Sequence, residues 1–441
     1  MTDVTLTPFA RPFAASIAPP GSKSLTNRAL VIAALGDGKS TLSNVLFADD
    51  TEVMIAGLEA LGFKLHVDRK KGRIKVDGKS GAVPAKTAEI DCGNSGTTIR
   101  FLAALCALGT GTYRLTGVAR MRERPIGELG ELLTALGGKV RYEEREGYPP
   151  IVIEGAGLPG GRATFPAAHS SQYLSAVLLA APYAAEDVVI DLEPEQTSWP
   201  YVEMTARLML DFGVQAVISL EHPGERPGIR PVVRPKQIRA FRGVYWDLDY
   251  AIEPDASNAT YFMAAAAIRP GARVTIPGLG RSSLQGDVGF SEVLQKMGAT
   301  VTLDDDAVTV AGTEKLHGID VDMAGMPDAA MTLAAIAVFA HGRTTIRGLH
   351  TFRVKETDRL AAIETELRKL GATVEIHDDT LHIDPPHDVR PADIDTYEDH
   401  RMAMAFAVVG TRAEGITIRG AECVSKTYPR FFEDMETLRG G

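Results

Sequence analysis

The stretch NRALVIAALGDGKSTLSNVL, residues 27–46, sets the architecture of this chain because its pattern recurs along the sequence. It reads as an apolar helix, then a glycine turn, then a short strand. Each helix is apolar nearly all round, which is typical of a helix buried on every side. The pattern predicts six repeats. Five further copies follow at intervals of about 70 to 86 residues, starting at Thr97, Ser171, Ser257, Ala329 and Arg401.

A second segment type alternates with these helices: an amphipathic helix ending at glycine, then two strands joined by a polar turn. The glycine suits the position after a helix end, and the strands alternate apolar and polar residues. A looser copy follows Leu208, and the sixth repeat lacks the hairpin and closes on FFEDMETLRGG. Clear copies are LEALGFKLHVDRKKGRIKVDG, LLTALGGKVRYEEREGYPPIVIEG, LQKMGATVTLDDDAVTVAG and LRKLGATVEIHDDTLHIDPP.

Six such repeats in 441 residues exceed one compact core, so three plus three is the economical division. The longest interval lies between the third and fourth copies, which puts a boundary within about residues 220–256. We expect one domain over 21–254, inserted into a second domain made of 1–20 and 255–441. The N-terminal strand would complete that second domain, with hinge crossings near Pro20 and Pro254.

Composition narrows the class of protein. The chain is 45% hydrophobic and 24% charged with a net charge of -10, which excludes a disordered chain and argues against nucleic acid as a partner. Three cysteines without CxxC spacing indicate a reducing, cytoplasmic compartment. The start MTDVTLTPFARPF is no secretory signal, and the apolar run Ala259–Ile268 is too short to cross a bilayer. We expect a monomer with no metal, cofactor or membrane partner.

Residues suited to anion binding stand just before five of the six buried helices. PGSKSLTNR places Lys23 and Arg28 where free backbone N–H groups attract anions. Each motif also has an ordinary explanation: a Ser or Asp cap, a buried salt bridge of Arg100, a solvated arginine loop, or a charge-paired helix. The other motifs are GNSGTTIR (93–100), RMRERP (120–125), Ser170-Ser171-Gln172, Asp328, RVKETDR (353–359), Asp399-His400-Arg401 and Lys426.

Taken together, these motifs predict a cationic cleft in an acidic protein. If both domains stack their helices in parallel, the helix starts face each other, and the cleft would suit small polyanions. Asp328 and Glu356 would be the carboxylates nearest to it, and hence candidate proton carriers.

Eight motifs in order resemble the 5-enolpyruvylshikimate-3-phosphate synthases along nearly the whole chain: PGSKSLTNR, GNSGTTIR, RMRERPI, HSSQYL, MPDAAMTLA, RVKETDRL, YEDHRMAMA and SKTYPRFF. The resemblance implies an α/β fold of two domains, each with three βαβαββ repeats and buried parallel helices, and an active site in the interdomain cleft. It also implies transfer of the enolpyruvyl group of phosphoenolpyruvate to the 5-hydroxyl of shikimate 3-phosphate. Phosphate leaves through a tetrahedral intermediate, in the biosynthesis of chorismate and aromatic amino acids.

The resemblance further implies roles for individual residues. Asp328 would take the hydroxyl proton, and Glu356 would protonate the methylene carbon with help from Lys23. Shikimate 3-phosphate would be held by Lys23, Ser24, Arg28, Ser170, Ser171, Gln172, Ser198, Tyr201, Asp328, Thr351 and Lys355. Phosphoenolpyruvate would be held by Lys23, Asn94, Gly96, Arg124, Gln172, Arg359, Arg401 and Lys426.

The sequence departs from that family at four positions. Ser95 and Phe101 stand where the family usually has Ala and Pro, which leaves sensitivity to glyphosate open. Thr351 stands where Asn is usual, and Phe352 replaces a usual Trp.

Three alternatives remain in view. A UDP-N-acetylglucosamine enolpyruvyltransferase shares fold and chemistry, but that family carries a cysteine in the loop matching residues 117–126, which has none here. An RNA 3′-phosphate cyclase would want a nucleotide site and a basic surface. A non-catalytic anion-binding protein of the same fold would be expected to lose Lys23, Asp328 or Glu356.

Overall fold

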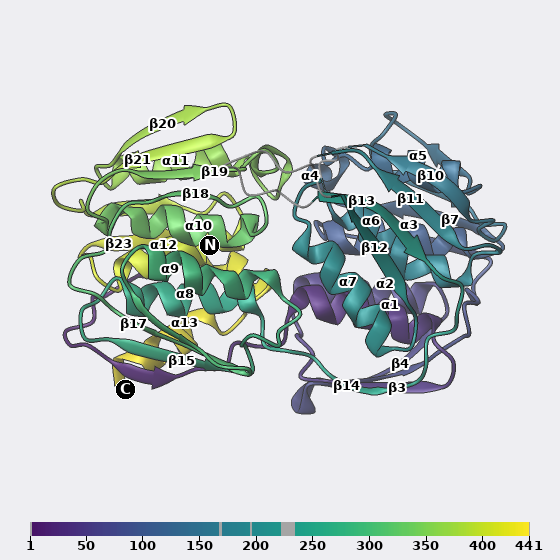
Figure 1. Cartoon of the computed structure of the whole chain (residues 1–441), viewed down its shortest axis with the longest axis horizontal. Helices are drawn as coiled ribbons and strands as arrows, with labels where there is room; N and C mark the ends of the chain where they lie inside the picture. Colours follow the sequence, from purple (N-terminus) through teal and green to yellow (C-terminus); the bar gives the residue numbers. More distant parts are fainter. Residues whose placement is uncertain (1, 167–169, 195, 222–233, 441) are drawn as a thin grey trace. The chain divides into compact units, whose positions relative to one another are not determined.

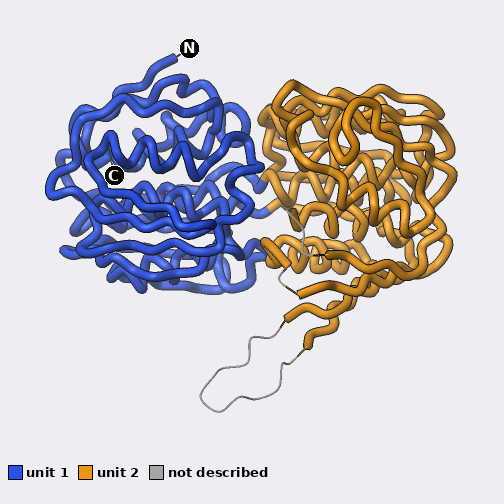
Figure 2. Tube along the Cα trace, turned by 90° about the horizontal axis from the view of Figure 1, so that it is seen from above, with its two compact units in different colours: residues 1–22, 253–441 blue, residues 23–252 orange. Residues whose placement is uncertain are grey.

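The structure is a computed structural model that describes residues 2–166, 170–194, 196–221 and 234–440. The chain divides into two compact units (Figure 2). Unit 1 consists of Met1–Ser22 and Glu253–Gly441, and unit 2 is Lys23–Ile252. The bounds expected from the repeats lie two residues from these at each junction. His169, which opens the HSSQYL motif, lies outside the described residues.

One sheet pattern recurs in both units. In the sheet β6-β7-β9-β8 (Thr87–Asp91, Thr112–Thr116, Ile151–Glu154 and Val140–Tyr142), the first pair is parallel and the other two pairs are antiparallel. The buried helix connects the parallel pair, and the amphipathic helix leads into the hairpin. The other four-stranded sheets among the described residues follow the same order. The predicted α/β fold of βαβαββ repeats is confirmed.

Unit 2 contains three of these sheets (Figure 1). Its α-helices are α1 (Lys23–Leu35), α2 (Asp49–Ala60), α3 (Gly96–Ala107), α4 (Ala119–Arg122), α5 (Gly127–Ala135), α6 (Gln172–Ala180) and α7 (Pro200–Asp211). Its strands are β3 (Lys39–Ser43), β4 (Lys64–Asp68), β5 (Arg73–Asp77), β6 (Thr87–Asp91), β7 (Thr112–Thr116), β8 (Val140–Tyr142), β9 (Ile151–Glu154), β10 (Gly161–Phe165), β11 (Val188–Leu192), β12 (Ala216–Glu221), β13 (Arg234–Ala240) and β14 (Asp249–Ala251).

Unit 1 repeats the arrangement of helices and strands. Its α-helices are α8 (Ala256–Ala267), α9 (Phe290–Lys296), α10 (Pro327–Ile336), α11 (Arg359–Lys369), α12 (His400–Gly410) and α13 (Phe431–Thr437). Its strands are β1 (Val4–Thr5), β2 (Ala14–Ser16), β15 (Arg273–Pro277), β16 (Thr300–Leu303), β17 (Ala307–Ala311), β18 (Asp320–Asp322), β19 (Thr344–Arg347), β20 (Thr373–His377), β21 (Thr380–Asp384), β22 (Ala392–Asp395) and β23 (Ile416–Arg419).

The N-terminal segment belongs to unit 1 and completes two of its sheets. β2 pairs in parallel with β15, so it supplies the strand that precedes α8 in the repeat. β1 pairs antiparallel with β23 and stands where the sixth repeat lacks its hairpin. In unit 2 the matching strand comes from the other end of the unit, because β14 pairs in parallel with β3.

The six repeat helices form the cores of the two units. Every residue of α3, α8 and α12 is buried. In unit 1, α8, α10 and α12 pack against one another (Figure 1), and in unit 2, α1, α3 and α6 do the same. Alanine and other small side chains allow this close approach. The polar residues that the sequence analysis singled out lie at or just before the starts of five of these six helices, α8 being the exception.

Two ordinary explanations of the motifs are wrong. RVKETDR (353–359) is not a charge-paired helix: Asp358 caps α11 by accepting a hydrogen bond from the backbone N–H of Ala361 at 3.2 Å, so the helix starts only at Arg359 and Lys355 lies before it. Asp328 is not a cap either: the cap position of α10 is Met326, and Asp328 lies in the first turn.

Candidate active-site residues

The predicted residues of unit 2 gather at the starts of α1, α3, α6 and α7, and we call them the unit-2 cluster. The cluster begins at α1, where the Lys23 ammonium lies 3.1 Å from the Asp50 carboxylate at the start of α2. Its other members on these helices or just before them are Ser24, Arg28, Asn94, Gly96, Ser170, Ser171, Gln172, Ser198 and Tyr201, joined by Arg124 from the loop after α4.

Arg28 links three helices within unit 2. Its side chain is buried, with the residue 1% exposed, and donates to the Thr205 hydroxyl at 2.7 Å and the Ser175 hydroxyl at 3.1 Å. It also donates to the backbone carbonyls of Ser24 and Tyr201. All of these acceptors are neutral oxygens, and burial lowers the pKa of Arg28 to about 10. The guanidinium is therefore a buried positive charge that a nearby anion would stabilise.

Arg100 joins α3 to α6. It donates to the Gln172 amide oxygen at 2.5 Å and to the Pro125 carbonyl at 3.3 Å. The Gln172 amide nitrogen donates to the Thr97 hydroxyl at 3.1 Å. These two contacts fix the orientation of the Gln172 amide, with its oxygen toward Arg100 and its nitrogen toward Thr97. The suggestion that Arg100 is a buried salt-bridge partner is wrong, since its hydrogen bonds go to neutral oxygens.

The arginine loop is not a uniformly solvated segment. Arg122 is exposed, whereas Arg124 is buried and donates to the Asn94 carbonyl at 3.1 Å and to its side-chain oxygen at 3.2 Å. Ser171 does not cap α6 with its hydroxyl; the Ser170 hydroxyl accepts from the Gln172 backbone instead. Ser198 has a φ of 50°, a strained conformation for a residue other than glycine.

In unit 1 the predicted residues form a continuous ion-pair network, which we call the unit-1 network. It consists of Asp328, Glu356, Arg359, Asp399, Arg401 and Lys426. The Asp328 carboxylate lies 3.0 Å from Arg359 and 2.9 Å from Arg401. Glu356 lies 3.0 Å from Arg359 and 3.6 Å from Lys426. Both predicted proton carriers are thus held by cations.

Arg359 is the centre of the unit-1 network. Its side chain is only 1% exposed and contacts three carboxylates: Asp328, Glu356 and Asp399. Burial by itself would lower the pKa of this guanidinium, but the attraction of Asp399, Glu356 and Asp328 outweighs burial and raises the pKa. Arg359 therefore stays charged at every working pH.

Two further predicted residues of unit 1 lie before α11. Lys355 has an extended backbone between a 3₁₀ helix (Phe352–Val354) and α11. Thr351 is buried, and its hydroxyl has no hydrogen-bond partner among the described residues. A buried hydroxyl normally has a partner, so Thr351 is suited to meet a ligand oxygen.

The sequence analysis missed Asp50 and Asp287. Asp50 is one of the acidic residues in the first turn of α2, which is an ordinary place for an aspartate. Only its contact with Lys23 links it to the unit-2 cluster. Asp287 is fully buried and hydrogen-bonds to the Ser257 hydroxyl. Burial, with Asp328 contributing, raises its pKa to about 6. No local pattern in the sequence marks it, because its partner is 30 residues away.

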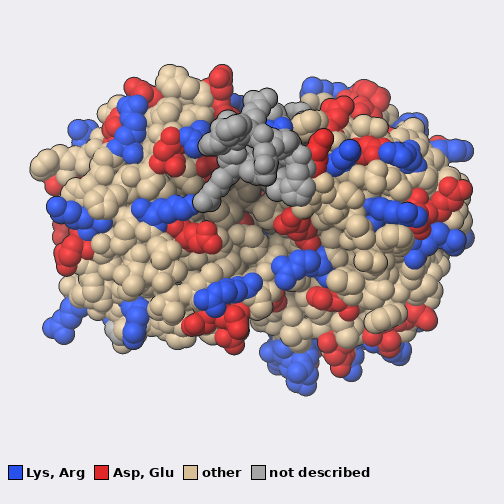
Figure 3. Space-filling view, in the orientation of Figure 1, with Lys and Arg blue, Asp and Glu red and all other residues tan. Residues whose placement is uncertain are grey.

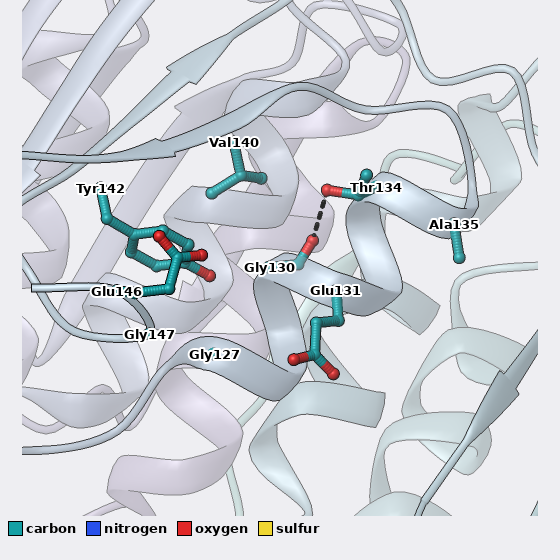
Figure 4. Close-up of a pocket in the computed structure, with 9 residues that line it drawn as sticks. All are labelled: Gly127, Gly130, Glu131, Thr134, Ala135, Val140, Tyr142, Glu146 and Gly147. Atoms are coloured by element: carbon teal, nitrogen blue, oxygen red, sulfur yellow. Dashed lines mark hydrogen bonds between the residues drawn. The ribbon is translucent and has the colours of Figure 1, made fainter.

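A hollow in unit 2 lies apart from these residues (Figure 4). Tyr142, Glu131 and Glu146 line it together with glycines and small side chains. The pKa of Tyr142 is raised to about 12 by burial and by the nearby glutamates. Carboxylates repel anions, so this hollow does not suit a polyanionic substrate. It contains none of the predicted site residues.

Charges elsewhere are mixed. On the face shown in Figure 3, Lys and Arg are interspersed with Asp and Glu, without a broad field of one sign. Within the described residues, no side chains of His, Cys, Asp and Glu form a set that could hold a metal ion. No helix in the described part of the chain is both long enough and apolar enough to span a membrane.

Comparison with known proteins agrees with this fold. The model of the EPSP synthase (3-phosphoshikimate 1-carboxyvinyltransferase) family matches residues 10–435. A 3-phosphoshikimate 1-carboxyvinyltransferase of Nostoc punctiforme is 44% identical over 440 residues, covering 99% of this chain and 100% of that protein. One of Escherichia coli (strain SMS-3-5 / SECEC) is 44% identical over 439 residues, covering 99% of each.

Solved structures show the same architecture. An EPSP synthase of Acinetobacter baumannii superposes with a TM-score of 0.78 at 25% identity, covering 99% of this chain and 98% of that one. The enolpyruvyl transferase NikO of Streptomyces tendae gives a TM-score of 0.73 at 18% identity, covering 99% and 97%, which bears on the fold alone. The class is therefore that of the enolpyruvyl transferase fold. Within it, the chain belongs to the EPSP synthase family and is an enzyme.

Proposed function

We propose that the unit-2 cluster and the unit-1 network carry out enolpyruvyl transfer. As a member of its family, the enzyme transfers the enolpyruvyl group of phosphoenolpyruvate to the 5-hydroxyl of shikimate 3-phosphate. Phosphate is released, and the product leads to chorismate and the aromatic amino acids. The arrangement that supports the proposed residue roles best is the Asp328 carboxylate shared by Arg359 and Arg401.

The chemistry needs one base and one acid. Asp328 accepts the proton of the 5-hydroxyl while that oxygen attacks C2 of phosphoenolpyruvate, and Glu356 delivers a proton to C3, assisted by Lys23. The resulting tetrahedral intermediate then loses phosphate from C2 and a proton from C3, which restores the double bond. Both carboxylates lie beside cations: Asp328 beside Arg359 and Arg401, and Glu356 beside Arg359 and Lys426.

The cations hold the phosphates and the carboxylates. An arginine fork matches the planar oxygens of a carboxylate or a phosphate better than a lysine does. Phosphoenolpyruvate would be bound by Lys23, Asn94, Gly96, Arg124, Gln172, Arg359, Arg401 and Lys426. Shikimate 3-phosphate would be bound by Lys23, Ser24, Arg28, Ser170, Ser171, Gln172, Ser198, Tyr201, Asp328, Thr351 and Lys355. The buried charge of Arg28 and the unpartnered hydroxyl of Thr351 support two of these roles.

We further propose that the enzyme works as a cytoplasmic monomer, without metal, cofactor, nucleic acid or membrane partner. The free thiols of Cys92, Cys106 and Cys423 suit a reducing compartment. Light scattering on the purified protein tests the oligomeric state, and a dimer would overturn this part of the proposal.

Phosphate release tests the acceptor. The purified protein is mixed with phosphoenolpyruvate and either shikimate 3-phosphate or UDP-N-acetylglucosamine. We expect release only with shikimate 3-phosphate. Release only with the sugar nucleotide would move the chain to the sister activity, and no release with either would favour a non-catalytic protein.

A variant tests the base. We expect Asp328→Ala to lose nearly all turnover while far-UV circular dichroism stays unchanged. Asp305→Ala is the matched control, because the Asp305 side chain is 89% exposed in unit 1. Turnover retained by Asp328→Ala would remove Asp328 from the mechanism.

A further inference from the structure

A strained turn connects β22 to α12 in unit 1. Tyr397 and Glu398 have φ values of 53° and 56°. The backbone N–H of Asp399 donates to the Thr396 carbonyl at 2.8 Å, which closes the turn around them. Two successive positive φ values are the signature of a type I′ turn, which normally contains Asn and Gly. Tyr and Glu adopt this conformation only where other contacts hold them there.

Glu366 on α11 supplies those contacts. Its buried carboxylate accepts the Tyr397 hydroxyl at 2.6 Å and the Asp395 backbone N–H at 3.1 Å. Lys369 lies 2.8 Å from Glu366 and 2.7 Å from Asp395. Burial and the bond to Glu366 raise the pKa of Tyr397 to about 12, so its hydroxyl remains a donor at neutral pH. Glu366 thus holds the turn from both sides.

The turn places Asp399 in the unit-1 network, beside Arg359. Asp399 directly follows the two strained residues, and its side chain is completely buried. It accepts from the Arg359 Nε at 2.8 Å and Nη2 at 3.3 Å, and it caps α12 by accepting from the Arg401 backbone at 2.9 Å. Asp399 therefore fixes the plane of the Arg359 guanidinium together with Asp328 and Glu356.

Helix geometry makes these contacts interdependent. Arg359 and Glu366 are seven residues apart on α11, which is close to two full turns, so both lie on one face of the helix. The same turn of chain contacts both: Asp399 binds Arg359, and Tyr397 binds Glu366. Loosening the Tyr397 end frees the turn to relax from its strained conformation and to shift Asp399.

We propose that Tyr397 and Glu366 are positioning residues that fix Arg359 through Asp399. The inference rests on the proposed role of Arg359 in binding phosphoenolpyruvate. Neither residue touches substrate in this scheme, so neither is catalytic. Their effect is carried by the orientation of a guanidinium that forms a fork with its ligand.

Tyr397→Phe is the first test, because it removes one hydroxyl and keeps the ring. We expect KM for phosphoenolpyruvate to rise by about fivefold to twentyfold, as for loss of a hydrogen bond to a charged group. KM for shikimate 3-phosphate should stay within about twofold. Tyr250→Phe is the matched control: it also removes a tyrosine–carboxylate hydrogen bond, to Asp211, but in unit 2. Glu366→Gln is a second variant, and we expect it to raise KM for phosphoenolpyruvate in the same way. It replaces Tyr397→Phe in the test if Tyr397→Phe does not fold.

Combination with Arg359→Lys separates positioning from general stability. If Tyr397 acts through Arg359, Tyr397→Phe raises KM for phosphoenolpyruvate in the parent but not in the Arg359→Lys enzyme. An equal rise in both backgrounds, or no rise in the parent, overturns the inference. Arg359→Lys with an unchanged KM for phosphoenolpyruvate would instead refute the proposed binding role of Arg359, whatever Tyr397 does.

Discussion

Gly96 lies against the end of the Arg124 side chain: a Cβ added to Gly96 would come within 2.7 Å of the Arg124 Nη2, so the guanidinium would have to shift. The same Cβ would meet the Arg100 Nη1 at 3.0 Å. Glycine at the start of α3 leaves space for these two guanidinium groups, and no positive φ is involved there. The Arg124 guanidinium lies against the first turn of a buried helix, where an anion is also attracted by the backbone N–H groups.

Gly96→Ala should therefore weaken phosphoenolpyruvate binding. The methyl group pushes Arg124 away from its hydrogen bonds with Asn94, and we expect KM for phosphoenolpyruvate to rise by about tenfold or more. The thermal midpoint should stay close to that of the parent, because the helix preference of alanine offsets part of the loss of the Arg124 hydrogen bonds. Steady-state kinetics with each substrate varied in turn, together with a thermal melt, check both expectations.

Gly243→Ala is the control for this substitution. It is also in unit 2, and its Cβ would meet only a methyl group of Val214 at 3.3 Å as nearest neighbour. We expect its kinetics to match the parent. An unchanged KM for phosphoenolpyruvate in Gly96→Ala would show that Arg124 has room to move without loss of binding.

Asp50→Asn should lower turnover more than it weakens substrate binding. The substitution keeps the shape but removes the charge 3.1 Å from the Lys23 ammonium, so Lys23 is less firmly oriented. Loss of a negative charge favours anion binding, while misplacement of an assisting group slows chemistry by about tenfold or more. Measurement of kcat and KM separates the two effects. A raised KM with normal kcat would show that Lys23 binds substrate without assisting the chemistry.

Arg359→Ala should destabilise unit 1 far more than removal of a surface arginine. It leaves the buried Asp399 carboxylate without its guanidinium partner, and we expect a loss of about 3 to 5 kcal/mol. Arg343→Ala breaks a pair with Asp384 in which the side chains are 45% and 39% exposed, and should cost less than about 1 kcal/mol. Urea denaturation of both variants compares them. Equal losses would contradict the central structural role of Arg359.

Asp287→Asn should change how stability depends on pH. The pKa of Asp287 is about 6 in the folded protein against 3.8 for an ordinary aspartate. Between those values the folded state binds more protons than the unfolded state, so this group's contribution is complete below about pH 4 and is lost as the pH rises through about 6. Asparagine does not titrate. The stability of the variant relative to the parent should therefore rise over this window, by at most about 3 kcal/mol.

Urea midpoints of both proteins measured at several pH values from 4 to 7 test this expectation. Asp305→Asn is the control, since its exposed side chain should give a curve parallel to the parent. A difference between Asp287→Asn and the parent that stays constant across the window would show that Asp287 does not titrate there.

Much of the fold could be predicted because the repeat is a matter of local chemistry. Runs such as ALVIAALGDGKSTLS dictate a buried helix, a turn and a strand without reference to distant residues. The helix starts were equally readable, since the motifs at Lys23, Gly96 and Arg401 stand directly before or within apolar helices. The start of α11 was misread, because periodicity does not show that Asp358 caps the helix and leaves Lys355 outside it.

The sequence by itself determined the repeated architecture, the family and the residues that the chemistry would draw on. Only the tertiary structure decided which of these charges meet. Asp328 contacts Arg359 and Arg401 across gaps of 31 and 73 positions, Lys23 finds Asp50, and Tyr397 holds Glu366. Local patterns carry helix and strand preferences. A buried ion pair depends instead on how separate helices pack, because packing sets the distance between side chains that are far apart in the sequence.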